Sequence, residues 1–245
     1  MPHPPPSTNS RLPTTDSPVA ATGPEGRRAQ RRGRRPLAVA LLALLGFASV
    51  LLLVVLGGAA AFDVRATLGW QRVRAPGLLP LMQGVSWLGF QPQAGYLTFG
   101  AIAFLFARRL HLEGGFALLA LLCGFLSGPI KGLIERPRPV AEREGIVVQF
   151  AVGGYSFPSG HVLTYTIFGG FLAYLTYTLV GWRPLRVGLL AFLLGLIALV
   201  GPSRVYLGQH WATDTLASYF LGTAILVALL ALYRLVKARQ LAAAP

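Results

Sequence analysis

Residues 36–62 read PLAVALLALLGFASVLLLVVLGGAAAF, without a single charged side chain. A helix needs about 20 consecutive apolar residues to cross the hydrocarbon core of a membrane, and this stretch is longer than that. It also exceeds the apolar region of a secretory signal peptide, which runs for about 7–15 residues. We therefore predict a retained membrane helix here.

The composition extends this prediction to the whole chain. Hydrophobic residues make up 54% of the sequence and charged residues only 12%, against about 25% charged residues in soluble domains. We predict an all-α polytopic membrane protein with six transmembrane helices, and short interfacial helices within residues 63–92. The predicted spans cover residues 36–62, 93–107, 114–130, 161–180, 187–200 and 215–233.

The chain divides into three predicted parts. Residues 1–35 are rich in Pro, Ser, Thr and Arg and have few large apolar side chains, so we expect a disordered basic tail. Residues 36–236 form the membrane domain, and residues 237–245 form a short C-terminal tail. Cys123 is the only cysteine, which excludes a disulfide framework and a cysteine metal site.

Positive charge predicts the orientation. The net charge is +14, and six arginines immediately precede the first span: Arg27, Arg28, Arg31, Arg32, Arg34 and Arg35. Next to a membrane helix, such a run favours anionic lipid headgroups over nucleic acid as its partner. With six spans, the basic ends and loops fall on one side, so both termini are expected in the cytoplasm and the protein in the cell membrane.

Three polar clusters remain, and this topology places all of them on the extracytoplasmic side. The first is Lys131-Gly-Leu-Ile-Glu-Arg-Pro-Arg138-Pro139, and the second is Pro158-Ser159-Gly160-His161. The third contains Ser203-Arg204, then His210 and, four residues later, Asp214. Because the topology was derived from charge alone, their convergence on one side independently supports a single site.

The residue types in these clusters suit a phosphate group. Lys131, Arg138 and Arg204 are cations at a membrane edge, where charge is costly and marks ligand sites. Three converging cations repel one another unless an anion lies between them, and Arg pairs with phosphate oxygens through two parallel hydrogen bonds. Ser159 and Gly160 open a span, where free backbone N–H groups bind anions.

The histidines suggest acid–base and nucleophilic chemistry. His161 follows directly on the predicted anion site. His210 and Asp214 are four residues apart, so they share a helical face, and a carboxylate there orients the imidazole and stabilises its cationic form. Taken singly, each cation has a simpler interpretation as an interfacial anchor. Arg136 and Arg143 are interpreted as ordinary loop charges, and Trp211 as an interface anchor.

Together the clusters resemble the signature of the type-2 phosphatidic acid phosphatase and vanadium haloperoxidase superfamily. That signature reads Lys-x6-Arg-Pro, Pro-Ser-Gly-His and Ser-Arg-x5-His-x3-Asp, and this sequence matches every fixed position in order. The resemblance implies that His210 attacks phosphorus, that Asp214 orients it and that His161 protonates the leaving oxygen. It implies that the remaining motif residues bind phosphate without a metal or other cofactor: Lys131, Arg138, Ser159, Gly160 and Arg204.

The expected function is hydrolysis of a lipid phosphate or pyrophosphate, such as undecaprenyl pyrophosphate, phosphatidic acid, phosphatidylglycerol phosphate or a lipid A phosphate. The resemblance leaves two alternatives open, a phosphotransferase and a vanadate-dependent haloperoxidase; six spans argue against the latter, because the similar haloperoxidases are soluble. A channel would need polar residues along the spans, whereas the ionisable residues gather at one edge. No residue chooses among the lipids, and none indicates an oligomeric state.

Overall fold

The computed structural model describes residues 24–141 and 145–243, with side chains from residue 35 onwards. Within these residues the regular elements are helices, as predicted. Their bounds are α1 Pro24–Val55, α2 Ala60–Gln71, α3 Leu78–Trp87, α4 Gln93–Ala107, α5 His111–Gly124, α6 Ser127–Ile134, α8 Gly160–Thr164, the π-helical η2 Tyr165–Gly169, α9 Gly170–Leu179, α10 Arg183–Tyr206 and α11 Ala212–Ala242.

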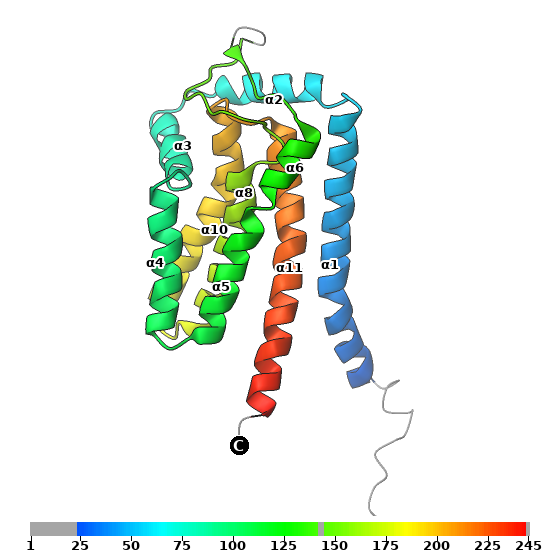
Figure 1. The fold of residues 1–245 in the computed structure, drawn as a ribbon, viewed down its shortest axis with the longest axis vertical. Helices are drawn as coiled ribbons and strands as arrows, with labels where there is room; N and C mark the ends of the chain where they lie inside the picture. The colour runs from blue at the N-terminus through cyan, green and yellow to red at the C-terminus, as the bar shows by residue number, and fades with distance from the viewer. Residues whose placement is uncertain (1–23, 142–144, 244–245) are drawn as a thin grey trace, which may run out of the picture.

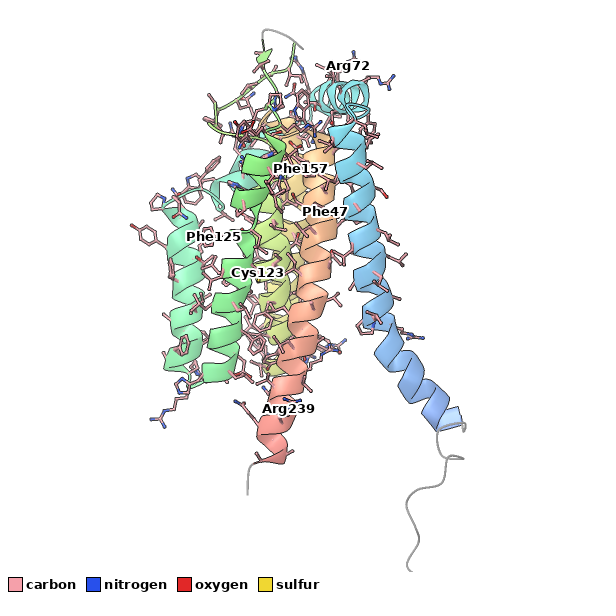
Figure 2. All side chains as sticks on the ribbon, turned by 45° about the vertical axis from the view of Figure 1, so that its right-hand side comes forward. Phe47, Arg72, Cys123, Phe125, Phe157 and Arg239 are labelled. Atoms are coloured by element: carbon pink, nitrogen blue, oxygen red, sulfur yellow. The ribbon has the colours of Figure 1, made fainter. Side chains whose placement is uncertain are left out.

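The long helices run side by side, and α2 lies across one end of them (Figure 1). We call this the α2 end. The start of α1 and the end of α11 lie at the opposite end, so Arg72, which caps the end of α2, and Arg239 on α11 are far apart (Figure 2). The described helices thus have the up-and-down arrangement that the predicted spans require.

Five segments in the described residues are long and apolar enough to cross a membrane: Arg35–Val55, His111–Ile134, Gly160–Leu179, Arg183–Tyr206 and Ala212–Ala242. The sixth predicted span is α4, an apolar helix of 15 residues. At 1.5 Å per residue, α4 reaches only about 22 Å, short of a bilayer core of about 30 Å. Helix α3 lies directly above α4 and extends this side of the bundle (Figure 1).

Several boundaries differ from the predicted ones, because charge marks depth in a membrane rather than the end of a helix. Helix α1 ends at Val55 and not at residue 62, since Gly57 turns the chain with a φ of 74°. Helix α11 continues through Arg234 and Lys237 to Ala242. At the other end of the chain, α1 begins at Pro24, inside the predicted tail, and residues 1–23 lie outside the described residues.

Residues 63–92 form two short helices, α2 and α3, as predicted. Helix α3 packs against α10, with Met82, Val85 and Ser86 buried. Leu81 and Trp87 of the same helix remain exposed, so only one side of α3 packs against the bundle. This packing brings the end of α3 into the part of the molecule that holds the polar motifs.

The core lies between α5, η2 with α9, and α11. The Tyr233 ring meets the rings of Phe116 and Phe171 edge to face, with centroids 5.4 Å and 5.6 Å apart. Near the end opposite α2, Lys237 Nζ of α11 lies 2.5 Å from Glu113 Oε1 of α5, and Tyr233 donates to the same oxygen. Helix α1 packs along α11, and Phe47 of α1 stacks on Phe157 beside the second motif (Figure 2).

Candidate active site

All three motifs lie at the α2 end, at the ends of four different elements. Lys131 lies on α6, and Arg138 is in the loop that follows. His161 is in the first turn of α8, directly after Ser159 and Gly160. The third motif runs from the end of α10 to the start of α11.

His210 is in the tight connection between α10 and α11. Gly208 turns the chain here with a φ of 69°, and a Cβ atom at this position would lie 2.5 Å from the Val147 carbonyl oxygen. The His210 side chain is only 2% exposed. The positive φ of residue 208 and the close approach of the Val147 carbonyl group both require glycine at this position.

The contacts of His210 define which ring nitrogen carries the proton. Arg138 Nη1 lies 3.1 Å from His210 Nε2, and a guanidinium has donors only. Nε2 is then the acceptor and the proton lies on Nδ1, which faces Asp214 Oδ2 at 3.4 Å. In this tautomer the lone pair of Nε2 is directed at the Arg138 guanidinium.

Asp214 is fully buried in the first turn of α11. Its Oδ2 accepts a hydrogen bond from the Trp211 backbone N–H at 2.9 Å, and its Oδ1 accepts one from Arg136 Nη1 at 2.6 Å. Both oxygens are thus held in place, with Oδ2 on the side of His210. A fixed carboxylate in this position stabilises an imidazolium without reorganising.

The three motif cations are partnered by neutral groups. Arg138 donates to the carbonyl oxygens of Gln209 and Gly154, and Lys131 donates to that of Tyr155 at 2.6 Å. Arg204, only 1% exposed, donates to the Ser86 hydroxyl and lies over the Phe90 ring. Because no carboxylate neutralises these cations in the described residues, they create a positive potential that suits an anion.

His161 is connected to the same region through Phe90, whose ring packs edge to face on the imidazole with centroids 4.8 Å apart. His161 Nε2, Ser159 Oγ and Arg204 Nε are buried and have no hydrogen-bond partner among the described residues. Leaving a buried polar atom unpartnered costs about 1–3 kcal/mol. Three such atoms from two motifs point to a bound polar ligand.

The surroundings of His210 favour its neutral form. Burial lowers the pKa of His210 well below its usual value, and the charges of Arg204, Arg138 and Lys131 lower it further. The Ser156 backbone acts in the opposite direction without reversing the shift. These effects favour the neutral imidazole, the form that acts as a nucleophile or base.

An apolar cavity of about 500 Å³ adjoins the site. His161, Gly160 and Ser127 line its polar end, and the rest of its wall comes from α4, α5, η2, α9 and α10 with residues such as Thr98, Leu172 and Leu196. Its position places an apolar volume next to a cationic pocket.

The structure corrects two sequence interpretations. Arg136 is no ordinary loop charge, since it pairs with Asp63 and Asp214 in the interior. Trp211 is no interface anchor, because it is buried and its Nε1 donates to the Pro137 carbonyl oxygen. Arg143 lies outside the described residues.

Sequence analysis also missed two residues that shape the site. Asp63 was assigned only to a surface segment, although it is a lone acid next to an apolar span and such a charge needs a partner. Gly89 carries no sequence signal. Its absent side chain leaves room for His161, since a Cβ atom there would lie 2.3 Å from the imidazole Cδ2.

The family follows from a match over residues 113–238 to the PAP2 superfamily, a range that includes every motif residue named above. The chain belongs to the PAP2 superfamily. It is 32% identical over 154 residues to phosphatidylglycerophosphatase B of Bacillus subtilis (strain 168), covering 61% of this chain and 72% of the relative.

Solved structures agree with this PAP2 assignment. The crystal structure of a transmembrane PAP2-type phosphatidylglycerolphosphate phosphatase from Bacillus subtilis superposes with a TM-score of 0.65 at 25% identity, covering 80% of this chain and 94% of that one. Aquifex aeolicus LpxE shares the fold, with a TM-score of 0.53 at 23% identity over 68% of this chain and 94% of its own. This PAP2 protein is therefore a membrane-embedded lipid phosphatase, a phosphoric monoester hydrolase.

We expect Gly89→Ala to lower kcat by about 10–100-fold, because the new methyl group displaces the His161 ring and small misplacements of reacting groups are costly. Gly84→Ala on α3 is the matched control, since a Cβ atom there meets nothing within 4 Å. Phosphate release and thermal unfolding in detergent would be measured for both. A wild-type kcat in Gly89→Ala would show that the site tolerates displacement of His161.

We also expect Lys131→Gln to shift the acid limb of the kcat/KM profile to higher pH. The Lys131 charge disfavours the imidazolium and lowers the pKa of His210, so removing it raises that pKa and protonates the ring at a higher pH. Lys131→Arg keeps the charge and should leave the limb in place. If the acid limb of the kcat/KM profile does not move in Lys131→Gln, the charge of Lys131 does not influence the pKa of His210.

Proposed function

We propose that this protein hydrolyses a phosphate or pyrophosphate ester of a membrane lipid through a phosphohistidine at His210. The observation that carries the proposal is the setting of the His210 ring, with Nε2 against Arg138 and Nδ1 toward Asp214. An imidazole held this way between a phosphate-binding cation and a carboxylate is arranged as an activated nucleophile. Phosphatidylglycerol phosphate is the first candidate substrate, because the Bacillus subtilis relative is a phosphatidylglycerophosphatase.

The reaction has two steps. In the first, the Nε2 lone pair of His210 attacks phosphorus, the bond from phosphorus to the lipid oxygen breaks, and His161 donates a proton to that oxygen. In the second, water attacks phosphorus, the N–P bond breaks, and His161 takes the proton from the water. Inorganic phosphate leaves, and both histidines return to their starting states.

The phosphate oxygens are assigned to the residues that lack charged partners. Arg138 and Arg204 supply guanidinium donors and Lys131 a point charge. Ser159 adds its hydroxyl, and Gly160 admits the anion close to the start of α8. These groups stabilise charge on the phosphoryl group as it is transferred.

The lipid chain is assigned to the apolar cavity. A substrate with its phosphate among the cations has its leaving oxygen near His161, which lines both regions. Charged loops on the other side of the bundle support a site facing away from the cytoplasm, so the substrate would be drawn from the outer leaflet. The basic start of the chain would then contact anionic lipid on the cytoplasmic side.

The covalent step is tested by trapping phosphoenzyme from a ³²P-labelled lipid phosphate, using an alkaline denaturing quench because N–P bonds are labile in acid. We expect label in the wild type with EDTA present, and neither label nor turnover in His210→Ala. His161→Ala should lose about 10²–10⁴-fold in rate, with partial rescue by an activated aryl phosphate. Label retained in His210→Ala, or turnover that requires magnesium, would overturn the mechanism.

The assignment of the lipid chain to the apolar cavity is tested with Thr98→Phe, which fills part of that cavity. We expect a loss of at least about 10-fold in kcat/KM for a long-chain lipid phosphate and little change for a short-chain water-soluble analogue. Thr178→Phe on the exposed surface of α9 is the matched control. Equal losses of kcat/KM for both substrates in Thr98→Phe would mean that the lipid chain does not bind in this cavity.

A further inference from the structure

Arg136 forms a buried bridge between two carboxylates that come from distant parts of the chain. Its Nη2 lies 2.5 Å from Asp63 Oδ2 on α2, and its Nη1 lies 2.6 Å from Asp214 Oδ1 on α11. Both carboxylates are completely buried. Burial of three charged groups is favourable only when each has close partners, so this cluster has a demanding geometry.

Asp63 is held in place by more than the arginine. It accepts the backbone N–H of Thr213 at 2.9 Å and the hydroxyl of the same residue at 2.7 Å. The Thr213 hydroxyl in turn accepts a hydrogen bond from Arg136 Nη1. Asp63 therefore anchors α2 to the first turn of α11, directly next to Asp214.

The segment from residue 136 to residue 138 acts on both ring nitrogens of His210, directly through Arg138 and indirectly through Asp214. Arg138 donates to its Nε2, whereas Arg136 holds the carboxylate that faces its Nδ1. The intervening Pro137 has its carbonyl oxygen fixed by Trp211 Nε1 and Ser156 Oγ. One short segment thus sets the positions of the groups on the two ring nitrogens.

The charge balance of the cluster explains why Asp63 is present in addition to Asp214. Arg136 and Asp214 alone form a neutral pair, which would give little support to an imidazolium. With Asp63 the cluster holds two carboxylates and one guanidinium, which leaves one negative charge when both carboxylates are ionised. In a buried site that charge acts strongly on the ring next to it.

We propose that Asp63 and Arg136 are positioning residues for the reaction at His210. Arg136 holds Asp214 in the orientation that presents Oδ2 to the ring, and Asp63 fixes Arg136 and restores the negative charge of the cluster. Neither residue contacts the substrate. The inference rests on the proposed roles of His210 and Asp214.

The test is a pair of double-mutant cycles on the full-length enzyme in detergent. Asp63→Asn and Arg136→Lys are made alone and combined with Asp214→Asn. We expect each single variant to lower kcat by about 10–100-fold, as groups that orient a functional ligand do, while KM and inhibition by inorganic phosphate stay within about twofold. In the Asp214→Asn background, each should cost less than about threefold more, because residues acting through one partner are not additive.

Glu113→Gln is the control for loss of a buried ion pair, since Glu113 pairs with Lys237 at the far end of the bundle. It should lower the thermal unfolding temperature and leave kcat unchanged. If Asp63→Asn fails to fold, the cycle with Arg136→Lys decides the question alone.

Three outcomes would overturn the inference: wild-type kcat in Asp63→Asn and Arg136→Lys, additive losses in the double variants, or a large rise in KM and in the phosphate inhibition constant for Arg136→Lys. The last would make Arg136 a phosphate ligand. Wild-type kcat in Asp214→Asn would instead overturn the proposed role of Asp214 itself, so failure of the two proposals is distinguishable.

Discussion

Arg204 lies at the end of an apolar helix with its side chain 1% exposed, and burying a cation there requires a compensating interaction. Its partners are a hydroxyl and an aromatic ring, which carry no negative charge. Arg138 and Lys131 likewise donate to backbone carbonyl oxygens. The cost of burying this positive charge is offset when an anion binds between the three cations.

Arg136, the fourth cation of this region, has charged partners instead of neutral ones. Arg136 is held between two carboxylates, so it contributes little positive potential to the site. Two arginines separated by one proline therefore have different electrostatic environments. The difference lies in the elements around them. Helix α2 supplies the Asp63 carboxylate to Arg136, whereas the α10–α11 connection supplies Arg138 with only a carbonyl oxygen and a ring nitrogen.

The polar site and the apolar cavity are joined at His161. The ring packs on Phe90 and against Gly89, and it also lines the cavity between α4 and α10. An amphipathic ligand fits such a boundary, with its charged head among the cations and its chain among apolar side chains. This arrangement accounts physically for a PAP2 phosphatase that acts on lipids.

The sequence by itself determined the helical class, the membrane spans and the motif residues. Long uncharged stretches such as residues 36–62 have few alternatives to a membrane helix, and the motif spacings are local properties of the chain. Only the tertiary structure decided the contacts of Asp63, Gly89 and Arg136. Asp63 and Arg136 meet across 73 positions of the sequence, and Arg136 and Asp214 across 78. Such contacts depend on how helices pack, and no local pattern of charge or hydrophobicity specifies them.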